Sequence, residues 1–276
     1  MTNIKNHLVK FSNGWESYVS ECMRLDNDSL NFYVTKHHEV YDTLINTVVP
    51  EMQSLVDDRI YKVKGSVGQS TLTGIPWLSV MDRNVTESTQ EGFYISYLFS
   101  KNAKRLHLSI ALGATQFENL YGKNNKTTEK ITKAKSQFVK NFERYSPAES
   151  FEVMDLLDEK DTNFVREFSP NMVRIANYYE GGSFFTKTYD LVNPNFEEGD
   201  IRDDLNRYVD SYRRIANDPT SEVLLEVLDE SVFEETDQKQ ESNLDYELPV
   251  FRPMIIGKES KKDTKQKKGT SKPRKP

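Results

Sequence analysis

The sequence predicts an α+β fold, in which a central, mostly antiparallel β-sheet is flanked by helices and followed by a disordered, charged C-terminal tail. Three observations support this prediction. Apolar residues recur every three or four positions before residue 60 and again after residue 130, as in amphipathic helices. Between these regions they recur in short, strand-like runs. From about residue 234 onward, charge and polarity rise while aromatic residues become rare, as in disordered chains.

Amphipathic patterns predict the helices. The first carries a stripe of apolar side chains at Ile4, Leu8, Phe11, Trp15 and Val19, and ends near residues 27–29. A second is expected at residues 40–49, after which Pro50 starts a short third one, because proline is tolerated in the first turn of a helix. Further helices are expected at residues 131–142, capped by Thr127 or Thr128, at residues 201–215, and at Val223–Leu228.

The expected strands lie between the helices. They are residues 61–64, 75–81, 92–99 and 105–111, with residues 100–103 as a hairpin turn. Met172–Tyr179 and Ser183–Tyr189 are predicted to form a strand pair around Gly181 and Gly182. Residues 112–126 are expected to be a loop, and residues 146–170 fit no single interpretation.

The charges divide the chain more sharply than its net charge of -6 indicates. We predict a helical part at residues 1–60, a domain core at 61–217, an acidic segment at 218–248 and a basic, linker-like tail at 249–276. The acidic segment holds eleven Asp or Glu and one Lys, whereas residues 258–276 hold nine Lys or Arg and two acids. When the charges of these C-terminal segments are subtracted from the net charge, residues 1–217 are close to neutral. A near-neutral charge is compatible with a DNA partner and with a protein partner.

Several classes of protein are excluded by composition. One cysteine and four histidines, of which only His37 and His38 are close in sequence, support neither an internal disulfide nor a zinc site, and no phosphate-binding glycine loop is present. No apolar run approaches the roughly 18 residues of a membrane span. We therefore expect a cytoplasmic protein that has no cofactor, no catalytic residues and no membrane partner. His107, within an expected strand, is interpreted as a surface or cross-strand packing residue.

Residues 61–117 are the most informative stretch for function. Basic residues at positions 62, 64, 101, 104 and 105 accompany aromatic residues at 77, 93, 94 and 97, a combination that suits phosphates and stacked bases. Alternation along the strand puts Phe93 and Tyr97 on one face, favoured as core. The opposite face, with Tyr94, Ser96 and Leu98, is the better candidate for a pocket.

The same stretch resembles the MrcB-like N-terminal domain family, which includes the DNA-recognition domain of the modified-cytosine restriction protein McrB. The matching segments are Val63-Lys64-Gly65-Ser66-Val67-Gly68-Gln69, Gly74-Ile75-Pro76-Trp77, Gly92-Phe93-Tyr94-Ile95-Ser96-Tyr97-Leu98-Phe99, Arg105-Leu106-His107-Leu108-Ser109, Gly113 and Tyr189-Asp190-Leu191. The resemblance covers roughly residues 30–215 and is strongest at 61–117.

The resemblance implies a non-enzymatic reader of double-stranded DNA in a restriction or phage-defence system, which flips a modified cytosine into an aromatic pocket. By position, the implied pocket residues are Trp77, Tyr94, Leu98 and Tyr179. The implied loop and backbone contacts are Lys64, Ser66, Val67, Gln69, Lys104 and Arg105. The loop at residues 65–74 lacks the aromatic residue that fills the vacated base stack in McrB. Val67, Gln69 and Leu72 are its only sizeable side chains, and a glutamine can fill such a gap.

The resemblance also implies an effector, a nuclease or an NTPase, either as a partner or as a downstream domain if the chain is truncated. Two alternatives remain open: a reader of an unmodified sequence that recruits a nuclease, and a protein-interaction subunit that uses the acidic segment and the basic tail. Mutation of Tyr94 is expected to be the cleaner test of the pocket, because Trp77 is expected to open its strand and to pack on one face.

Overall fold

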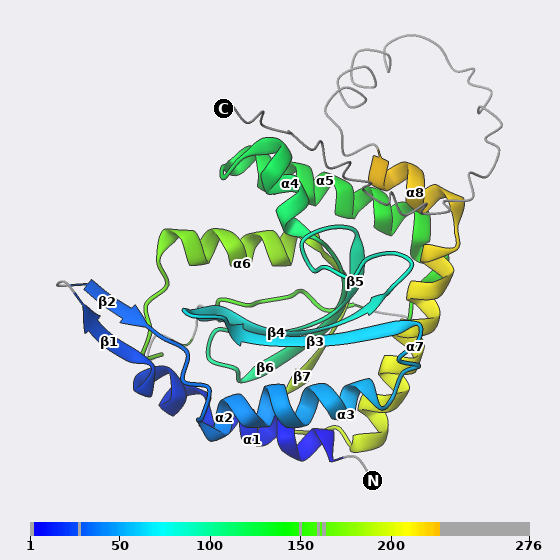
Figure 1. Ribbon diagram of the computed structural model, residues 1–276. Coiled ribbons are helices and arrows are strands. Elements are labelled where there is room, and N and C mark those ends of the chain that lie inside the picture. Colours follow the sequence, from blue (N-terminus) through cyan, green and yellow to red (C-terminus); the bar gives the residue numbers. More distant parts are fainter. Residues whose placement is uncertain (1–2, 27–28, 149–150, 159–160, 162–163, 227–276) are drawn as a thin grey trace, which may run out of the picture. The chain divides into compact units, whose positions relative to one another are not determined.

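The computed structural model describes residues 3–26, 29–148, 151–158, 161 and 164–226. At its centre is a five-stranded antiparallel sheet, whose strand order β3-β4-β5-β6-β7 follows the chain. The strands are β3 (Tyr61–Gly68), β4 (Leu72–Asp82), β5 (Phe93–Phe99), β6 (Arg105–Leu112) and β7 (Ser183–Asp190). Helices lie on both sides of the sheet, which confirms the predicted α+β class (Figure 1). The predicted tail lies outside the described residues.

The N-terminal helices pack on one face of the sheet. All five stripe residues of α1 (Ile4–Glu21) are buried, as their spacing predicts. A continuous helical stretch follows, made of α2 (Glu39–Tyr41), the π-helical segment η1 (Asp42–Val48) and α3 (Val49–Gln53). Pro50 lies in the first turn of α3, as predicted. These helices share one hydrophobic core with the sheet, here called the main core.

Strand β5 divides its side chains between two environments. Phe93, Ile95, Tyr97 and Phe99 are buried in the main core, as favoured for Phe93 and Tyr97. Tyr94 and Leu98 belong instead to two separate small clusters on the opposite face of the sheet. The two-residue period of a strand produces this division. The expected hairpin turn between β5 and β6 is also present, closed by a hydrogen bond from the Ala103 amide to the Ser100 carbonyl.

The sequence did not predict the hairpin that follows α1 or the helix that follows β6. A short hairpin of β1 (Met23–Asp26) and β2 (Ser29–Phe32) occupies a region interpreted only as a helix end. Helix α4 (Ala114–Tyr121) occupies part of the predicted loop. Gly113 lets the chain pass close to the preceding loop before α4, because a Cβ there would lie 2.5 Å from the amide nitrogen of Glu91.

The predicted strand at Met172–Tyr179 is wrong. These residues belong to helix α6 (Pro170–Gly182), and the following strand β7 pairs with β6 rather than with them. The Ser169 side chain caps α6 by accepting a hydrogen bond from the Met172 amide, and Pro170 occupies the first turn. Gly181 and Gly182, interpreted as a turn, end this helix instead. Local start signals therefore outweighed the strand propensity of Val173, Ile175 and the two tyrosines.

The later helices largely follow the prediction. Helix α5 (Asn125–Phe142) is capped by Asn124 rather than by Thr127 or Thr128, and a short 3₁₀ turn, η2 (Glu143–Tyr145), follows it. Helix α7 (Glu198–Ala216) buries the apolar stripe that predicted it. Helix α8 (Pro219–Glu226) begins earlier than the expected Val223–Leu228, whose last two residues lie outside the described part.

His107 is a buried packing residue with a perturbed pKa. Nδ1 lies 2.9 Å from the Thr188 hydroxyl, and burial, with the charge of Arg105, lowers its pKa from 6.5 to about 4. Between pH 6.5 and about pH 4, His107 is therefore protonated in the unfolded state but neutral in the folded state. The free energy of unfolding is therefore expected to fall as the pH is lowered from 6.5 to about 4, by at most about 1.4 kcal/mol per pH unit.

Urea unfolding at pH 7, 6 and 5 measures this effect. A His107→Gln variant, whose amide can still reach Thr188 but cannot titrate, serves as the control and should show a weaker pH dependence over this range. Identical slopes for the two proteins would contradict the prediction.

Candidate functional site: an aromatic pocket on one face of the sheet

A cavity of about 190 Å³ lies on the face of the sheet opposite α1 and α3. Its walls come from β4, β5, β6 and β7, from α4 and α6, and from the loop between β4 and β5. The four predicted pocket residues, Trp77, Tyr94, Leu98 and Tyr179, all line it. The structure therefore brings these side chains together from two strands and a helix.

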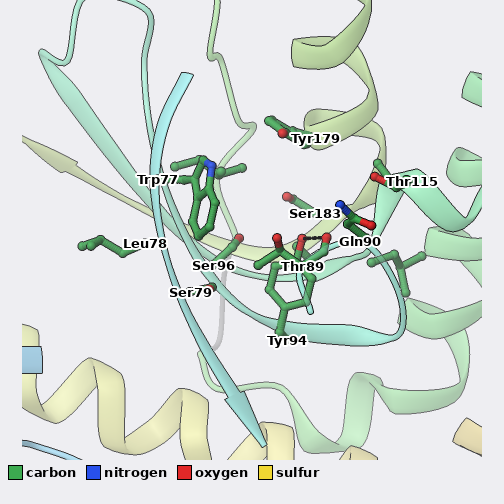
Figure 2. Close-up of a pocket in the computed structure, with 14 residues that line it drawn as sticks. Trp77, Leu78, Ser79, Thr89, Gln90, Tyr94, Ser96, Thr115, Tyr179 and Ser183 are labelled. Carbon is green, nitrogen blue, oxygen red and sulfur yellow. Dashed lines mark hydrogen bonds between the residues drawn. The ribbon is translucent and has the colours of Figure 1, made fainter. Parts of the chain in front are cut away.

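Three aromatic side chains border the cavity (Figure 2). Trp77 lies in the middle of β4, directly opposite Leu98 on β5, and its side chain is partly exposed. Tyr179 projects from α6 and is also partly exposed. Tyr94 is buried, with 6% of its surface exposed, and its hydroxyl donates a hydrogen bond of 2.9 Å to the Thr89 carbonyl. Trp77 does not open its strand as expected, and Tyr94 is the more firmly packed ring.

The hydroxyls of Tyr94 and Tyr179 remain protonated at physiological pH. Burial is the main cause that raises the pKa of both groups, and the carboxylate of Glu118 adds to the shift of Tyr179. Both phenols are thus neutral hydrogen-bonding groups rather than charges.

Small residues account for the space between the rings. Ser79 on β4 is directly opposite Ser96 on β5, which in turn is opposite Ser109 on β6. Ala111, two residues further along β6, is directly opposite Tyr94. A row of short side chains between larger ones leaves a hollow on the sheet surface.

Two wall serines have no hydrogen-bond partner. Ser96 and Ser109 bond each other at 2.8 Å, but the hydroxyls of Ser79 and Ser183, both buried, are unpartnered. Sequence reasoning did not select these two serines. The two-residue spacing from Trp77 could have indicated Ser79. Because residues 172–179 were predicted to be a strand, the sequence did not indicate that Ser183 and Tyr179 lie close together at the end of a helix.

The loop residues implied by the resemblance occupy different environments. Gln69 is exposed at the β3–β4 turn, and Ser66 accepts a hydrogen bond from the Gly68 amide. Val67, by contrast, is fully buried in the main core, so it is not presented at the surface. Lys64 donates to the Glu87 carbonyl, and burial and the charge of Lys62 lower its pKa.

Lys104 and Arg105 are held by acidic side chains. Lys104 lies 2.6 Å from Asp161, which raises the pKa of the lysine, and Arg105 contacts Asp155 and Asp158 at 2.9 and 2.8 Å. These carboxylates come from the region after residue 146, which the sequence left uninterpreted. The positive charge of both residues is therefore largely compensated within the protein.

A more basic surface lies on α5, which the sequence analysis did not select. Residues 114–142 contain six lysines and only two glutamates. Lys126, Lys133 and Lys140 are exposed, and Lys135 donates to the Glu180 carbonyl at the end of α6. Helix α5 packs against α4 and α6, both of which line the cavity. Its lysines therefore lie on elements adjoining the pocket.

The described part of the chain contains no cluster of His, Cys, Asp and Glu that could hold a metal ion. Among the helices described, none is both long enough and apolar enough to cross a bilayer.

The fold and the cavity together define a domain with an aromatic-walled pocket on one face of an antiparallel sheet. The model of the family described as "MrcB-like, N-terminal domain" matches residues 27–217, and the chain belongs to this family. This confirms the resemblance over nearly the expected range. The family is associated with DNA recognition in McrB-type restriction. Neither the curated proteins nor the solved structures contain a match.

Proposed function

We propose that this protein is a non-enzymatic DNA-recognition module of a restriction or phage-defence system, which reads a modified cytosine flipped into the aromatic pocket. One observation carries the proposal: Trp77, Tyr94, Leu98 and Tyr179, which are separated by up to about a hundred residues, line a single cavity. Flipping a base costs a few kcal/mol, which stacking on the partly exposed ring of Trp77 and hydrogen bonds to the base edge can offset. The nuclease or NTPase activity belongs to a partner or to another domain.

The size of the cavity supports a single-ring ligand. A cavity of about 150 Å³ is known to hold benzene, so about 190 Å³ suits one six-membered ring with small substituents. Leu98 and Ala111 supply apolar contact for a methyl group. Each carbon buried in this way contributes about 0.8 kcal/mol.

Phosphate contacts are assigned to the surface of α5. Helix α5 adjoins the elements that line the pocket, and several of its lysines are exposed. Gln69, at an exposed hairpin turn, is the residue proposed to fill the base stack after flipping.

The function is tested by titrating the protein with duplexes that differ at one position, carrying cytosine, 5-methylcytosine or 5-hydroxymethylcytosine. Preference for a modified duplex supports the proposal. Equal binding to all three would show that the protein binds DNA but does not recognise a modified cytosine. No binding at low salt would favour a protein-interaction subunit.

Salt dependence provides a separate prediction. The logarithm of the binding constant should fall linearly with the logarithm of the salt concentration, with a slope of about -0.9 per phosphate contacted. Deleting residues 258–276, which lie outside the described part, should lower non-specific affinity and leave base preference unchanged. Repeating the titration at four salt concentrations with both proteins measures this. A changed base preference in the deletion variant would contradict the prediction.

A further inference from the structure

Ser79 and Ser183 are unusual for buried polar side chains. Each is only 1% exposed, and neither hydroxyl has a hydrogen-bond partner. Buried polar atoms are nearly always hydrogen-bonded, since an unsatisfied group loses its bonds to water without replacement. Five such atoms occur among the described residues, and these two line the same cavity. Their hydroxyls are therefore available to hydrogen-bond a molecule that occupies the cavity.

We propose that Ser79 and Ser183 are the specificity-determining residues of the pocket, which hydrogen-bond the polar edge of a single-ring, pyrimidine base. This inference rests on the base-reading function proposed above and names the groups that perform the reading. A serine hydroxyl both donates and accepts, so it can bond the amino, ring-nitrogen or carbonyl groups of a pyrimidine.

The placement of the two serines supports this role. Ser79 is two residues from Trp77 on the same face of β4. Ser183 is the first residue of β7, and its amide donates to the Tyr179 carbonyl at the end of α6. Ser79 is therefore close in the chain to Trp77, and Ser183 is close to Tyr179. Both serines line the cavity that these rings border (Figure 2). The rings can hold the faces of a base while the serines contact its edge.

Reading by hydrogen bonds has a measurable consequence for selectivity. A pocket that relies on apolar contact distinguishes ligands weakly, whereas one with buried polar groups rejects an analogue that leaves those groups unpaired. The appropriate analogue has the shape and methyl group of a pyrimidine but no hydrogen-bonding edge. Difluorotoluene, an apolar mimic of thymine, meets this requirement.

The experiment compares wild type with Ser79→Ala and Ser183→Ala on duplexes that carry 5-methylcytosine, thymine or difluorotoluene at the read position. Wild type should prefer a natural pyrimidine over difluorotoluene. Each substitution should reduce that preference by about 2- to 12-fold, the range expected for one hydrogen bond. Thermal melts of the free proteins should be unchanged, because the removed hydroxyls bond nothing in the free protein.

Ser211→Ala is the matched control. Ser211 is a third buried serine with an unpartnered hydroxyl, but it lies on α7, away from the pocket. This variant should retain the wild-type preference. Undiminished preference in both pocket variants, or an equal loss in Ser211→Ala, would overturn the assignment while leaving the reader function intact. Equal binding of all three duplexes by wild type would instead refute base reading itself, and this inference with it.

Discussion

Trp77→Ala is expected to weaken binding to a duplex containing the preferred base by about 5- to 150-fold, while the melting temperature stays near that of wild type. Stacking on an aromatic ring contributes about 1–3 kcal/mol per base, as judged by alanine substitution. The Trp77 side chain is partly exposed and packs only against a small cluster outside the main core, so its removal costs little stability. Fluorescence anisotropy with labelled duplexes, alongside thermal melts, measures both quantities.

Two further variants sharpen this test. Trp77→Phe keeps a stacking ring and should retain most of the affinity. Phe151→Ala removes a ring that is 41% exposed and lies outside the pocket lining, so it should bind as wild type does. If Trp77→Ala binds as tightly as wild type, the Trp77 ring does not stack on the bound base. Tyr94→Ala is less informative than the sequence indicated, because Tyr94 is buried and hydrogen-bonded to Thr89.

Phe93→Ala is expected to lower the free energy of unfolding by about 3–5 kcal/mol, the usual cost of truncating a buried aromatic residue. Phe93 is 1% exposed, and its ring makes edge contacts with Phe138 and Tyr212 at centroid distances of 5.6 and 5.3 Å. Urea denaturation measures the loss. Where the variant is still folded, its preference among duplexes should equal that of wild type, because this side chain faces the main core.

Phe93→Leu provides the control for this prediction. It keeps most of the apolar volume and should cost much less than the alanine variant. A cost below about 1 kcal/mol for Phe93→Ala would show that the ring is not a core residue, and the assignment of the two faces of β5 would then be wrong.

Local patterns predicted the strands of the site better than its helices, α4 and α6. Alternation along β5 separates Phe93 and Tyr97 from Tyr94 and Leu98, because a strand's two-residue period depends only on neighbouring residues. Helix α6 was missed because its strand-forming residues precede two glycines that resemble a turn. Its start depends on the capping bond from Met172 to Ser169.

Long-range contacts explain most of the remaining differences. The sequence shows that Lys104 and Arg105 are basic, but their acidic partners lie about fifty residues away, in a region without a readable pattern. The missing hydrogen bonds of Ser79 and Ser183 are also a property of the folded chain alone. Only the family resemblance predicted that Trp77 and Tyr179 share a pocket, because nothing in their local sequence relates them.

The row of short side chains beneath the pocket has a consequence for how this domain can change. Ser79, Ser96 and Ala111 set the depth of the hollow, and none of them belongs to the main core. Exchanging one of them for a larger or smaller residue alters which ligand fits, while the residues that hold the sheet to α1, α5 and α7 stay the same. Residues required for folding and residues that shape the pocket are thus different sets, so a few substitutions can change which ligand fits without changing the scaffold.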